Sequence, residues 1–173
     1  MKKANKKEKP FYCVVNVADP HKPFFNDPSS IKKGFDEFEP TKIYTEEDIE
    51  IPGYLPNNPN IKKDVLNYYN SVKRGDDCIG EIINALKKSK FSENTIVILL
   101  SDHGAPFPCA KSSVYQNGVK TPLIVYYPRE FKPSTEKKSM VSSVDIAPTI
   151  LEMTGNTIPD EMVGQSFYSV LTK

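Results

Sequence analysis

The sequence has 173 residues, a length that fits one domain with a hydrophobic core. Its 23 Lys and Arg nearly balance its 22 Asp and Glu, and a net charge of +1 gives no indication of a nucleic-acid partner. Three widely spaced cysteines (Cys13, Cys78 and Cys109) argue against a disulfide scaffold or a zinc knuckle, and no stretch approaches the ~20 apolar residues of a membrane span.

The N-terminus, "MKKANKKEKP" followed by "FYCVVNVA", imitates the basic and apolar regions of a secretory signal peptide. The apolar part is short, however, Asn16 interrupts it, and "DPHKPF" follows where a small-residue cleavage site would be expected. We therefore expect residues 1–9 to form a lysine-rich lead that is followed by a buried strand. Residues 10–173 are expected to form the domain. The compartment of the protein stays open.

Three segments are predicted to be buried strands: 11–18, 95–100 and 121–127. They are continuous apolar runs rich in Val, Ile and Tyr, a pattern typical of strands that are covered on both faces in a parallel sheet. Between the first two strands the sequence predicts a long loop over 19–59 and then a helix of about thirty residues. Strand, long helix and strand in this order indicate an α/β crossover unit.

The long helix carries an apolar stripe at helical spacings, formed by Val65, Tyr69, Val72, Ile79, Ile83 and Leu86. Asp76 lies on this stripe and is expected to be a hydrogen-bonded structural partner rather than a catalyst. A turn at 92–94 leads into the second strand. "VDIAPTILEMTG" predicts a last helix with Asp145 near its N-cap and Gly155 at its end, and "GQSFYSVLTK" predicts a short closing element.

Both histidines follow predicted strands, at the carboxyl ends where open α/β sheets bind ligands. After the second strand, "SDHG" provides Asp102 and His103, a workable pair of metal ligands, and Gly104, which allows close backbone approach or a positive φ. Lys111 adds a mobile positive charge for a tetrahedral oxyanion, and His21, in "DPHKPF", can donate a proton or hold an anionic oxygen. Taken singly, these residues have ordinary alternatives: an Asx turn capping a strand, a surface histidine and a solvated lysine. Only their convergence favours a site.

The segments "NTIVILLSDHG", "YQNGVKTPLIVYYP", "VSSVDIAPTILEMTGNTIP" and "GQSFYSVL" resemble, in order and spacing, the second part of the large domain of the sulfatases. These enzymes belong to the alkaline-phosphatase-like superfamily. "YYNSVKRGDDCIGEIINAL" resembles the long helix before that block, so that the resemblance covers residues 10–171. "DPHKPF" and "DHGAPFPCAKSSVY" most resemble the heparan N-sulfatase (sulfamidase) branch. The resemblance implies an incomplete α/β sandwich with a mainly parallel central sheet flanked by helices.

The resemblance also implies roles for four residues. Asp102 matches an invariant metal-ligand aspartate, and His103 occupies a position where the family places Asn or His as another ligand. Lys111 stands where a Lys or Arg contacts the sulfate, and His21 matches the histidine that contacts the sulfate group or the leaving atom. Ca²⁺ is the implied metal as the family's usual ion, although an imidazole ligand suits Mn²⁺ or Zn²⁺ better.

The sequence departs from the family pattern at the nucleophile. Sulfatases form formylglycine from the Cys or Ser of a C/S-x-P-x-R motif, which these residues lack, and Cys109 is followed by "AKSS" instead. The paired aspartates that open the metal site and the Lys/His pair that supports the nucleophile are also missing. We therefore expect a fragment that is inactive alone. About five strand side chains without their covering would leave a deficit on the order of 10 kcal/mol, which predicts a marginal or self-associating chain.

Three functions stay open on the sequence. The first is hydrolysis of a sulfate ester or N-sulfate on a glycosaminoglycan-type sugar, once the missing part is supplied. The second is a phosphodiesterase, phosphonate hydrolase or phosphotransferase of the same superfamily, where "DHG" also occurs. The third is a non-catalytic remnant or interaction module. Family members are commonly periplasmic, secreted or lysosomal, but the sequence assigns no compartment.

Overall fold

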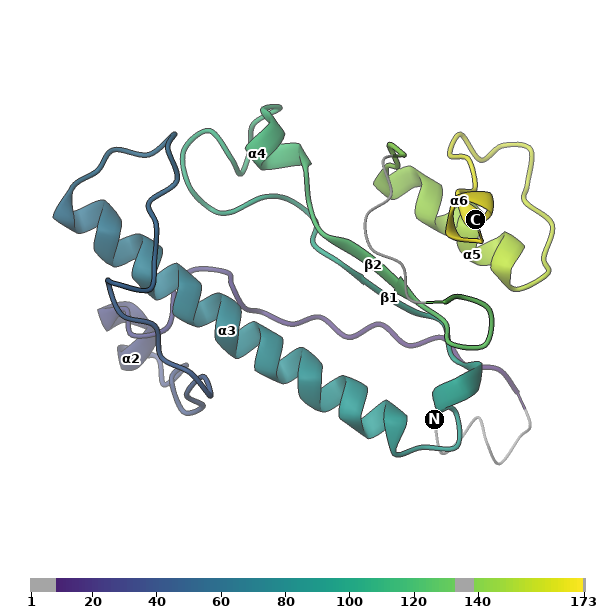
Figure 1. Cartoon of the computed structure of the whole chain (residues 1–173), viewed down its shortest axis with the longest axis horizontal. Helices are drawn as coiled ribbons and strands as arrows, with labels where there is room; N and C mark the ends of the chain where they lie inside the picture. The colour runs from purple at the N-terminus through teal and green to yellow at the C-terminus, as the bar shows by residue number, and fades with distance from the viewer. Residues whose placement is uncertain (1–8, 133–138, 173) are drawn as a thin grey trace. The chain divides into compact units, whose positions relative to one another are not determined.

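The computed structural model of the chain describes residues 9–132 and 139–172, so the predicted lead over 1–9 lies almost wholly outside the described residues. The described residues fall into two compact units. The first unit contains the chain up to Ser89 and Ser101–Thr121, and the second contains Lys90–Leu100 and the chain from Pro122 onward. In chain order the elements are α2 (Pro28–Lys32), α3 (Pro59–Lys87), the 3₁₀ turn η1 (Ser92–Asn94), β1 (Val97–Leu100), α4 (Gln116–Val119), β2 (Leu123–Tyr126), the 3₁₀ turn η2 (Ser143–Asp145), α5 (Ile146–Met153) and α6 (Tyr168–Leu171) (Figure 1).

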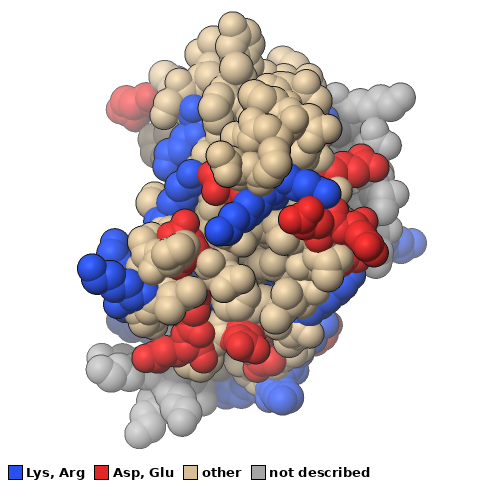
Figure 2. Space-filling view, turned by 90° about the vertical axis from the view of Figure 1, so that its left-hand side faces the viewer, with Lys and Arg blue, Asp and Glu red and all other residues tan. Residues whose placement is uncertain are grey.

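Acidic and basic side chains are interspersed on the face of the molecule shown in Figure 2. This distribution matches the near balance of 23 basic and 22 acidic residues in the sequence. Among residues 9–132 and 139–172, no helix combines the length and the apolarity that crossing a bilayer requires.

The longest element is α3, whose 29 residues agree with the long helix predicted after the loop. It begins where the sequence provides two helix-start signals. Asn58 accepts a hydrogen bond from the Ile61 amide (3.1 Å). Pro59 occupies the first turn, where a backbone N–H has no partner within the helix, so that proline loses no hydrogen bond there. Lys87 in the last turn lies at the negative end of the helix dipole. Figure 1 shows α3 as one continuous helix.

The buried face of α3 differs from the predicted apolar stripe. Of the stripe residues only Val65 and Leu86 are buried, and Val72 is 41% exposed. Asp76 is a structural partner as predicted, but it is exposed and paired with Lys73 at 3.1 Å. The other buried positions of the helix are polar or small: Asn67, Asn70, Ser71 and Gly75. The reason is that an irregular loop covers this face, and backbone groups of a loop need polar partners.

The loop over residues 19–59, which contains only the short helix α2, is fastened to α3 by side chains of the helix. Three of its backbone amides donate to helix side chains over sequence separations of 26 to 46 residues. The pairs are the Phe25 amide with Ser71 Oγ, the Thr41 amide with Asp77 Oδ2, and the Tyr44 amide with Asn70 Oδ1, each at 2.7 Å. Polar side chains of the helix therefore provide the partners that the backbone of this loop needs.

Asp77 is expected to make this fastening sensitive to acid. Hydrogen bonds from Lys73 and Thr41 lower the pKa of Asp77 to about 2. Because the folded-state pKa lies below the ordinary value of 3.8, the stabilisation is fully present above about pH 4 and is lost as the pH falls toward about 2. The urea midpoint should therefore fall less steeply between about pH 4 and pH 2 in Asp77→Asn than in the natural chain. Parallel pH profiles of the two proteins would contradict this expectation.

Arg74 is the second point at which α3 holds the loop. Its side chain is 12% exposed, and its guanidinium makes a two-armed contact with Asp19, with Nε 2.7 Å from Oδ2 and Nη2 3.0 Å from Oδ1. Its Nη1 donates to Asp36 Oδ1 and to the Phe35 carbonyl, both at 3.0 Å. Because Asp19 comes two residues before His21, this contact fixes the chain where the first candidate residue begins.

Replacing Arg74 by Lys should lower the free energy of unfolding by about 2–4 kcal/mol. An ammonium cannot make the planar two-armed contact, and two largely buried carboxylates lose part of their pairing. Urea denaturation followed by circular dichroism measures the loss. The matched control is Arg129→Lys, since Arg129 donates to Asn94 (3.0 Å) at an exposed position, where a change below about 0.5 kcal/mol is expected. Equal losses in the two variants would argue against this role of Arg74.

The core of the first unit draws its buried residues from loops as well as from α3: Phe24, Ile49, Leu55, Val65 and Phe107. Only Val65 belongs to a helix. Two of these residues stand near candidate site residues in the chain, because Phe24 follows His21 by three positions and Phe107 precedes Lys111 by four. The core therefore also anchors the segments that carry the site.

The predicted strand over 11–18 is not formed. These residues pair with no strand in the described part of the chain, and Tyr12, Val14 and Val15 are exposed. Strand propensity describes how well a side chain fits a pleated, half-buried surface, and without a neighbouring strand there is no such surface to fit. The expected burial of this segment is therefore wrong for the described chain.

The sheet of the second unit consists of β1 and β2, paired antiparallel from Val97↔Tyr126 to Leu100↔Leu123. The strands are shorter than the predicted 95–100 and 121–127, and their pairing differs from the predicted parallel arrangement. The cause is the connection over 101–122, which contains only the short helix α4 and returns the chain to the end of β1. The α/β class holds, but the predicted strand–helix–strand crossover does not form among the described residues.

The two strands are also less covered than predicted. Leu100, Ile124 and Tyr126 are exposed, and the other strand residues are half-buried. Apolar side chains predicted to lie between helices on both faces therefore remain open to solvent. Self-association of the chain through such surfaces stays a prediction.

The end of the second unit follows the sequence closely. Ser142 and Asp145 form a capping box before α5, in which the Ser142 amide donates to Asp145 Oδ2 (2.8 Å). Asp145 Oδ1 accepts from the Gln165 amide (2.8 Å), and this bond and the one from Ser142 lower the pKa of Asp145. Gly155 ends the helix with a φ of +72°, which favours glycine. α6 is the short closing element predicted from the tail.

Candidate active site

The turn that follows β1 in the chain carries Asp102 and His103. Ser101 Oγ donates to the His103 carbonyl (2.9 Å), and the His103 amide donates to Asp102 Oδ1 (3.0 Å). The Asp102 side chain is 83% exposed, and its Oδ2 is not used by these bonds. The turn is thus held by its own polar groups, while one carboxylate oxygen remains available to a ligand.

The ring of His103 is oriented by its backbone neighbour. Nδ1 lies 2.8 Å from the Gly104 carbonyl oxygen, and because a carbonyl can only accept, Nδ1 carries the proton. In the neutral ring, Nε2 then presents its lone pair. Metal-binding histidines have this arrangement, in which one ring N–H donates to a carbonyl and the opposite nitrogen binds the metal.

Asp102 Oδ2 and His103 Nε2 lie 3.3 Å apart. That separation fits two neighbouring ligands of one cation, which lie ~3.0–3.5 Å apart when the metal–ligand bonds are ~2.0–2.5 Å long. Within residues 9–132 and 139–172, no group of three or more His, Cys, Asp or Glu side chains is placed to hold a metal ion. The pair therefore fits a metal site for which the described residues supply two ligands.

Lys111 lies in a closely wound loop over 104–118. Its amide donates to the Ala105 carbonyl (3.0 Å), and the Gly104 amide closes the loop by donating to the Gly118 carbonyl (2.9 Å). Ala110, beside Lys111, is fully buried. The Lys111 side chain is half-buried, and no partner for its ammonium is found in the described part of the chain. The loop thus fixes the backbone of Lys111 and leaves its charge available to an anion.

Two glycines make this winding possible. A Cβ on Gly104 would overlap the Asn117 carbonyl, and a Cβ on Gly118 would overlap the carbonyls of Ala110 and Ser113. Of the two roles that the sequence allows for Gly104, the structure has the close backbone approach and not the positive φ. The close backbone contact at Gly118 is not predicted from the sequence, since "QNG" is typical of an ordinary turn.

His21 lies on the loop after residues 11–18 and is exposed. Its Nδ1 lies 2.6 Å from the Lys22 carbonyl oxygen, so Nδ1 carries a proton by the same reasoning as for His103. Nε2 is then the ring atom that can exchange a proton with a bound group. The His21 amide donates to the Ala18 carbonyl (2.9 Å), which closes a turn around the residue.

The structure brings Asp102 and His103 into contact and places His21 and Lys111 in the same compact unit. No hydrogen bond or ion pair among the described residues joins His21 or Lys111 to the pair or to each other. Their loops meet through apolar side chains instead, because the rings of Phe24 and Phe107 pack with centroids 6.1 Å apart. The sequence does not predict this contact, for which its signal is an aromatic residue close to each candidate, in "KPFF" and "PFPC".

The chain resembles known proteins along most of its length. The family model described as Sulfatase matches residues 1–156. The chain is 30% identical over 171 residues to an endo-4-O-sulfatase from Bacteroides thetaiotaomicron, and the match covers 92% of this chain and 32% of that protein. It is 30% identical over 157 residues to N-sulphoglucosamine sulphohydrolase from Homo sapiens, and this match covers 84% of this chain and 31% of that protein. The chain thus spans about a third of the length of these relatives.

Two solved structures share the fold over most of this chain. One comes from work on the metabolism of multiple glycosaminoglycans by Bacteroides thetaiotaomicron, with a TM-score of 0.77 and 25% identity over 99% of this chain and 37% of that one. The other is a phosphonate monoester hydrolase from Silicibacter pomeroyi, with a TM-score of 0.60 and 25% identity over 89% of this chain and 32% of that one.

Proposed function

The chain belongs to the sulfatase family and shares the fold of its alkaline-phosphatase-like members, and from this premise we propose that it contributes to hydrolysis of sulfate groups on glycosaminoglycan-type sugars. The bond broken would be a sulfuric ester or an N-sulfate. The observation that carries the proposal is that relatives covering 92% and 84% of the chain are an endo-4-O-sulfatase and an N-sulphoglucosamine sulphohydrolase. The contact between Asp102 and His103 supports it, as does the loop that leaves the charge of Lys111 available to an anion.

Asp102 and His103 are the residues that would hold a divalent cation, on which sulfatase family members generally depend. When bound, such a cation stabilises negative charge on anionic oxygens. We propose Ca²⁺ on the grounds of family membership, with Mn²⁺ and Zn²⁺ as alternatives. Ca²⁺ prefers oxygen ligands, whereas an imidazole nitrogen beside a carboxylate suits the two transition metals.

Lys111 and His21 would act on the substrate itself. The Lys111 ammonium, on its closely wound loop, would contact a sulfate oxygen as a mobile positive charge. When the sulfur–oxygen or sulfur–nitrogen bond breaks, the leaving atom takes up a proton. The protonated ring of His21 would donate that proton from Nε2, while Nδ1–H remains bonded to the Lys22 carbonyl.

The nucleophile of this reaction would be supplied by protein outside residues 1–173, because no C/S-x-P-x-R motif lies within this sequence. We therefore propose that these 173 residues do not turn over substrate alone. They would contribute two metal ligands, an anion contact and a proton donor to a larger sulfatase. The proposed partner is a sulfated sugar bound to that complete enzyme.

Hydrolysis by a chimera tests the proposal. The nucleophile-bearing part of the Bacteroides thetaiotaomicron endo-4-O-sulfatase would precede this chain, and 4-nitrophenyl sulfate and N-sulfated glucosamine would be the substrates. Lys111→Met should lower kcat/KM by about 100-fold, since it removes a charge aimed at the sulfate. Lys120→Met, at the exposed end of α4, is the matched control and should leave kcat/KM unchanged. A folded chimera that cleaves neither substrate would overturn the proposal.

The fold shared with a phosphonate monoester hydrolase supports a second candidate, hydrolysis of phosphonate monoesters or phosphodiesters. The same chimera would be assayed with 4-nitrophenyl phenylphosphonate and bis-4-nitrophenyl phosphate. A higher kcat/KM on these substrates than on the sulfates would favour the second candidate. A non-catalytic interaction module, the third possibility, predicts that none of the four substrates is cleaved.

A further inference from the structure

We propose that Phe24, Tyr68 and Phe107 form an aromatic clasp that fixes the loop of His21 relative to the loop of Lys111, a positioning role that rests on the function proposed above. The three rings belong to three separate segments of the first unit. Phe24 lies on the loop after His21, Tyr68 lies on α3, and Phe107 lies on the loop of Lys111. None of the three is expected to touch the sulfate group.

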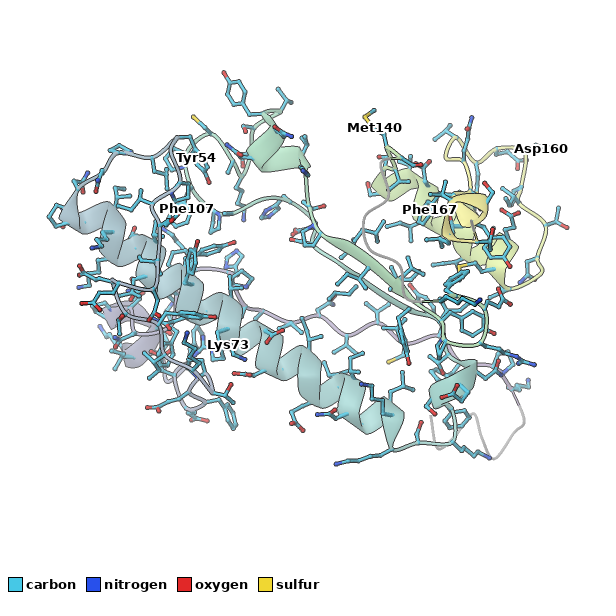
Figure 3. All side chains as sticks on the ribbon, viewed as in Figure 1. Tyr54, Lys73, Phe107, Met140, Asp160 and Phe167 are labelled. Carbon is cyan, nitrogen blue, oxygen red and sulfur yellow. The ribbon has the colours of Figure 1, made fainter. Side chains whose placement is uncertain are left out.

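The rings contact one another in a closed triangle. Tyr68 meets Phe24 at a centroid distance of 5.6 Å with an interplanar angle of 67°, and it meets Phe107 at 5.3 Å and 77°. The third side, Phe24 to Phe107, is 6.1 Å. Edge-to-face pairs at such distances are favourable beyond the area they bury, so each ring restricts the other two. Figure 3 labels Phe107 near α3, the helix that carries Tyr68.

The triangle is closely packed. Phe24 and Phe107 are 2% and 6% exposed, and burial raises the pKa of the Tyr68 hydroxyl. A close-packed interior transmits displacement, because side chains in it cannot move without moving their neighbours. A shift of either phenylalanine would therefore reach the other loop.

The connection from each ring to its candidate residue is short, and a backbone hydrogen bond holds the chain beside each candidate. On one side, the Ala110 amide donates to the Phe107 carbonyl (3.2 Å), and Lys111 follows directly. On the other side, only Lys22 and Pro23 separate His21 from Phe24, and the His21 amide donates to the Ala18 carbonyl (2.9 Å). No hydrogen bond or ion pair joins the two loops within the described residues. The clasp is therefore the part of the core through which the two loops contact each other.

Amide hydrogen exchange of the full 173-residue chain, measured by NMR, tests the clasp. Phe24→Leu should raise the exchange rate of the Lys111 amide about tenfold, and Phe107→Leu should do the same for the His21 amide, since each loop loses its support. The double variant should raise both exchange rates no further than the single variants do, because each variant removes the same contact between Phe24 and Phe107. Phe131→Leu is the matched control, since Phe131 packs against Tyr127 and Tyr168 in the second unit and should leave both amides unchanged.

A titration with inorganic sulfate, followed on the ring signals of His21, separates this inference from the proposed function. Phe24→Leu and Phe107→Leu should weaken sulfate binding about tenfold, while Phe131→Leu should not change it. The inference would be overturned if each substitution left the amide exchange rate on the opposite loop unchanged, or if exchange rose uniformly over the first unit. Sulfate affinity that both variants retain would also overturn it. Reciprocal exchange effects in the chain would leave the clasp in place even where the chimera cleaves neither sulfated substrate, the result that contradicts the proposed function.

Discussion

Mn²⁺ added to the natural chain should broaden the amide NMR signals of Ser101–Gly104, and Asp102→Asn should lose this broadening. Paramagnetic broadening reports weak and rapidly exchanging binding, which is what a pair of ligands provides. Asp102 Oδ2 and His103 Nε2, 3.3 Å apart, are the atoms expected to bind. Replacing the carboxylate by an amide removes the negative charge of the site and should weaken the affinity about 100-fold, on the order of 3 kcal/mol.

Asp160→Asn is the matched control for this experiment. Asp160 is an exposed aspartate of the second unit (Figure 3), and its loss should leave the broadening at Ser101–Gly104 unchanged. Competition then identifies the ion: recovery of the signals on addition of Ca²⁺ or Zn²⁺ shows that the added ion takes the same site. Broadening that persists in Asp102→Asn, or that centres on another acidic segment, would rule out the assigned ligands.

The helices could be predicted because their signals are local. Asn58 and Pro59 mark the start of α3, and Ser142, Asp145 and Gly155 mark the limits of α5 within a few residues of the helix itself. Such caps satisfy backbone groups that the helix leaves unbonded, whatever surrounds it. The buried face of α3 could not be predicted in the same way, because the choice of Asn70 and Ser71 over Val72 depends on a loop that docks from 26 to 46 residues away.

The strands could be predicted only in part because pairing is not local. Apolar runs place β1 and β2 within two residues of their true limits, yet the same kind of run over 11–18 forms no strand among the described residues. A run of Val and Ile shows that a segment fits a sheet, but its partner and direction depend on the rest of the sheet. The antiparallel pairing of Leu100 with Leu123 therefore could not be predicted from the sequence.

The candidate site shows the same division between local and distant signals. Asp102 and His103 are adjacent in the chain, so that their contact needed only a turn after β1. The spacing of His21 and Lys111 depends on Phe24 and Phe107, whose contact joins residues more than eighty positions apart in the sequence. A single sequence carries no signal for such a contact beyond the aromatic character of its two partners.

Gly104→Ala should lower the free energy of unfolding of the first unit by about 3–5 kcal/mol. The added methyl group would overlap the Asn117 carbonyl, a backbone atom that cannot turn away as a side chain can. Relieving the overlap requires the loop to open, which breaks the hydrogen bond from the Gly104 amide to the Gly118 carbonyl (2.9 Å). Urea denaturation measures the loss, and faster exchange of the Lys111 amide should accompany it.

The matched control, Gly80→Ala, should have the opposite sign. A Cβ on Gly80 meets nothing within 4 Å, and alanine in a helix interior is favoured over glycine by about 0.5–1 kcal/mol. The same added methyl group should thus destabilise the loop and stabilise α3. If Gly104→Ala were as stable as the natural chain, the loop could not be wound as described, and the position of Lys111 would lose its physical basis. If both variants were destabilised alike, the loss in Gly104→Ala would not be specific to the overlap with the Asn117 carbonyl.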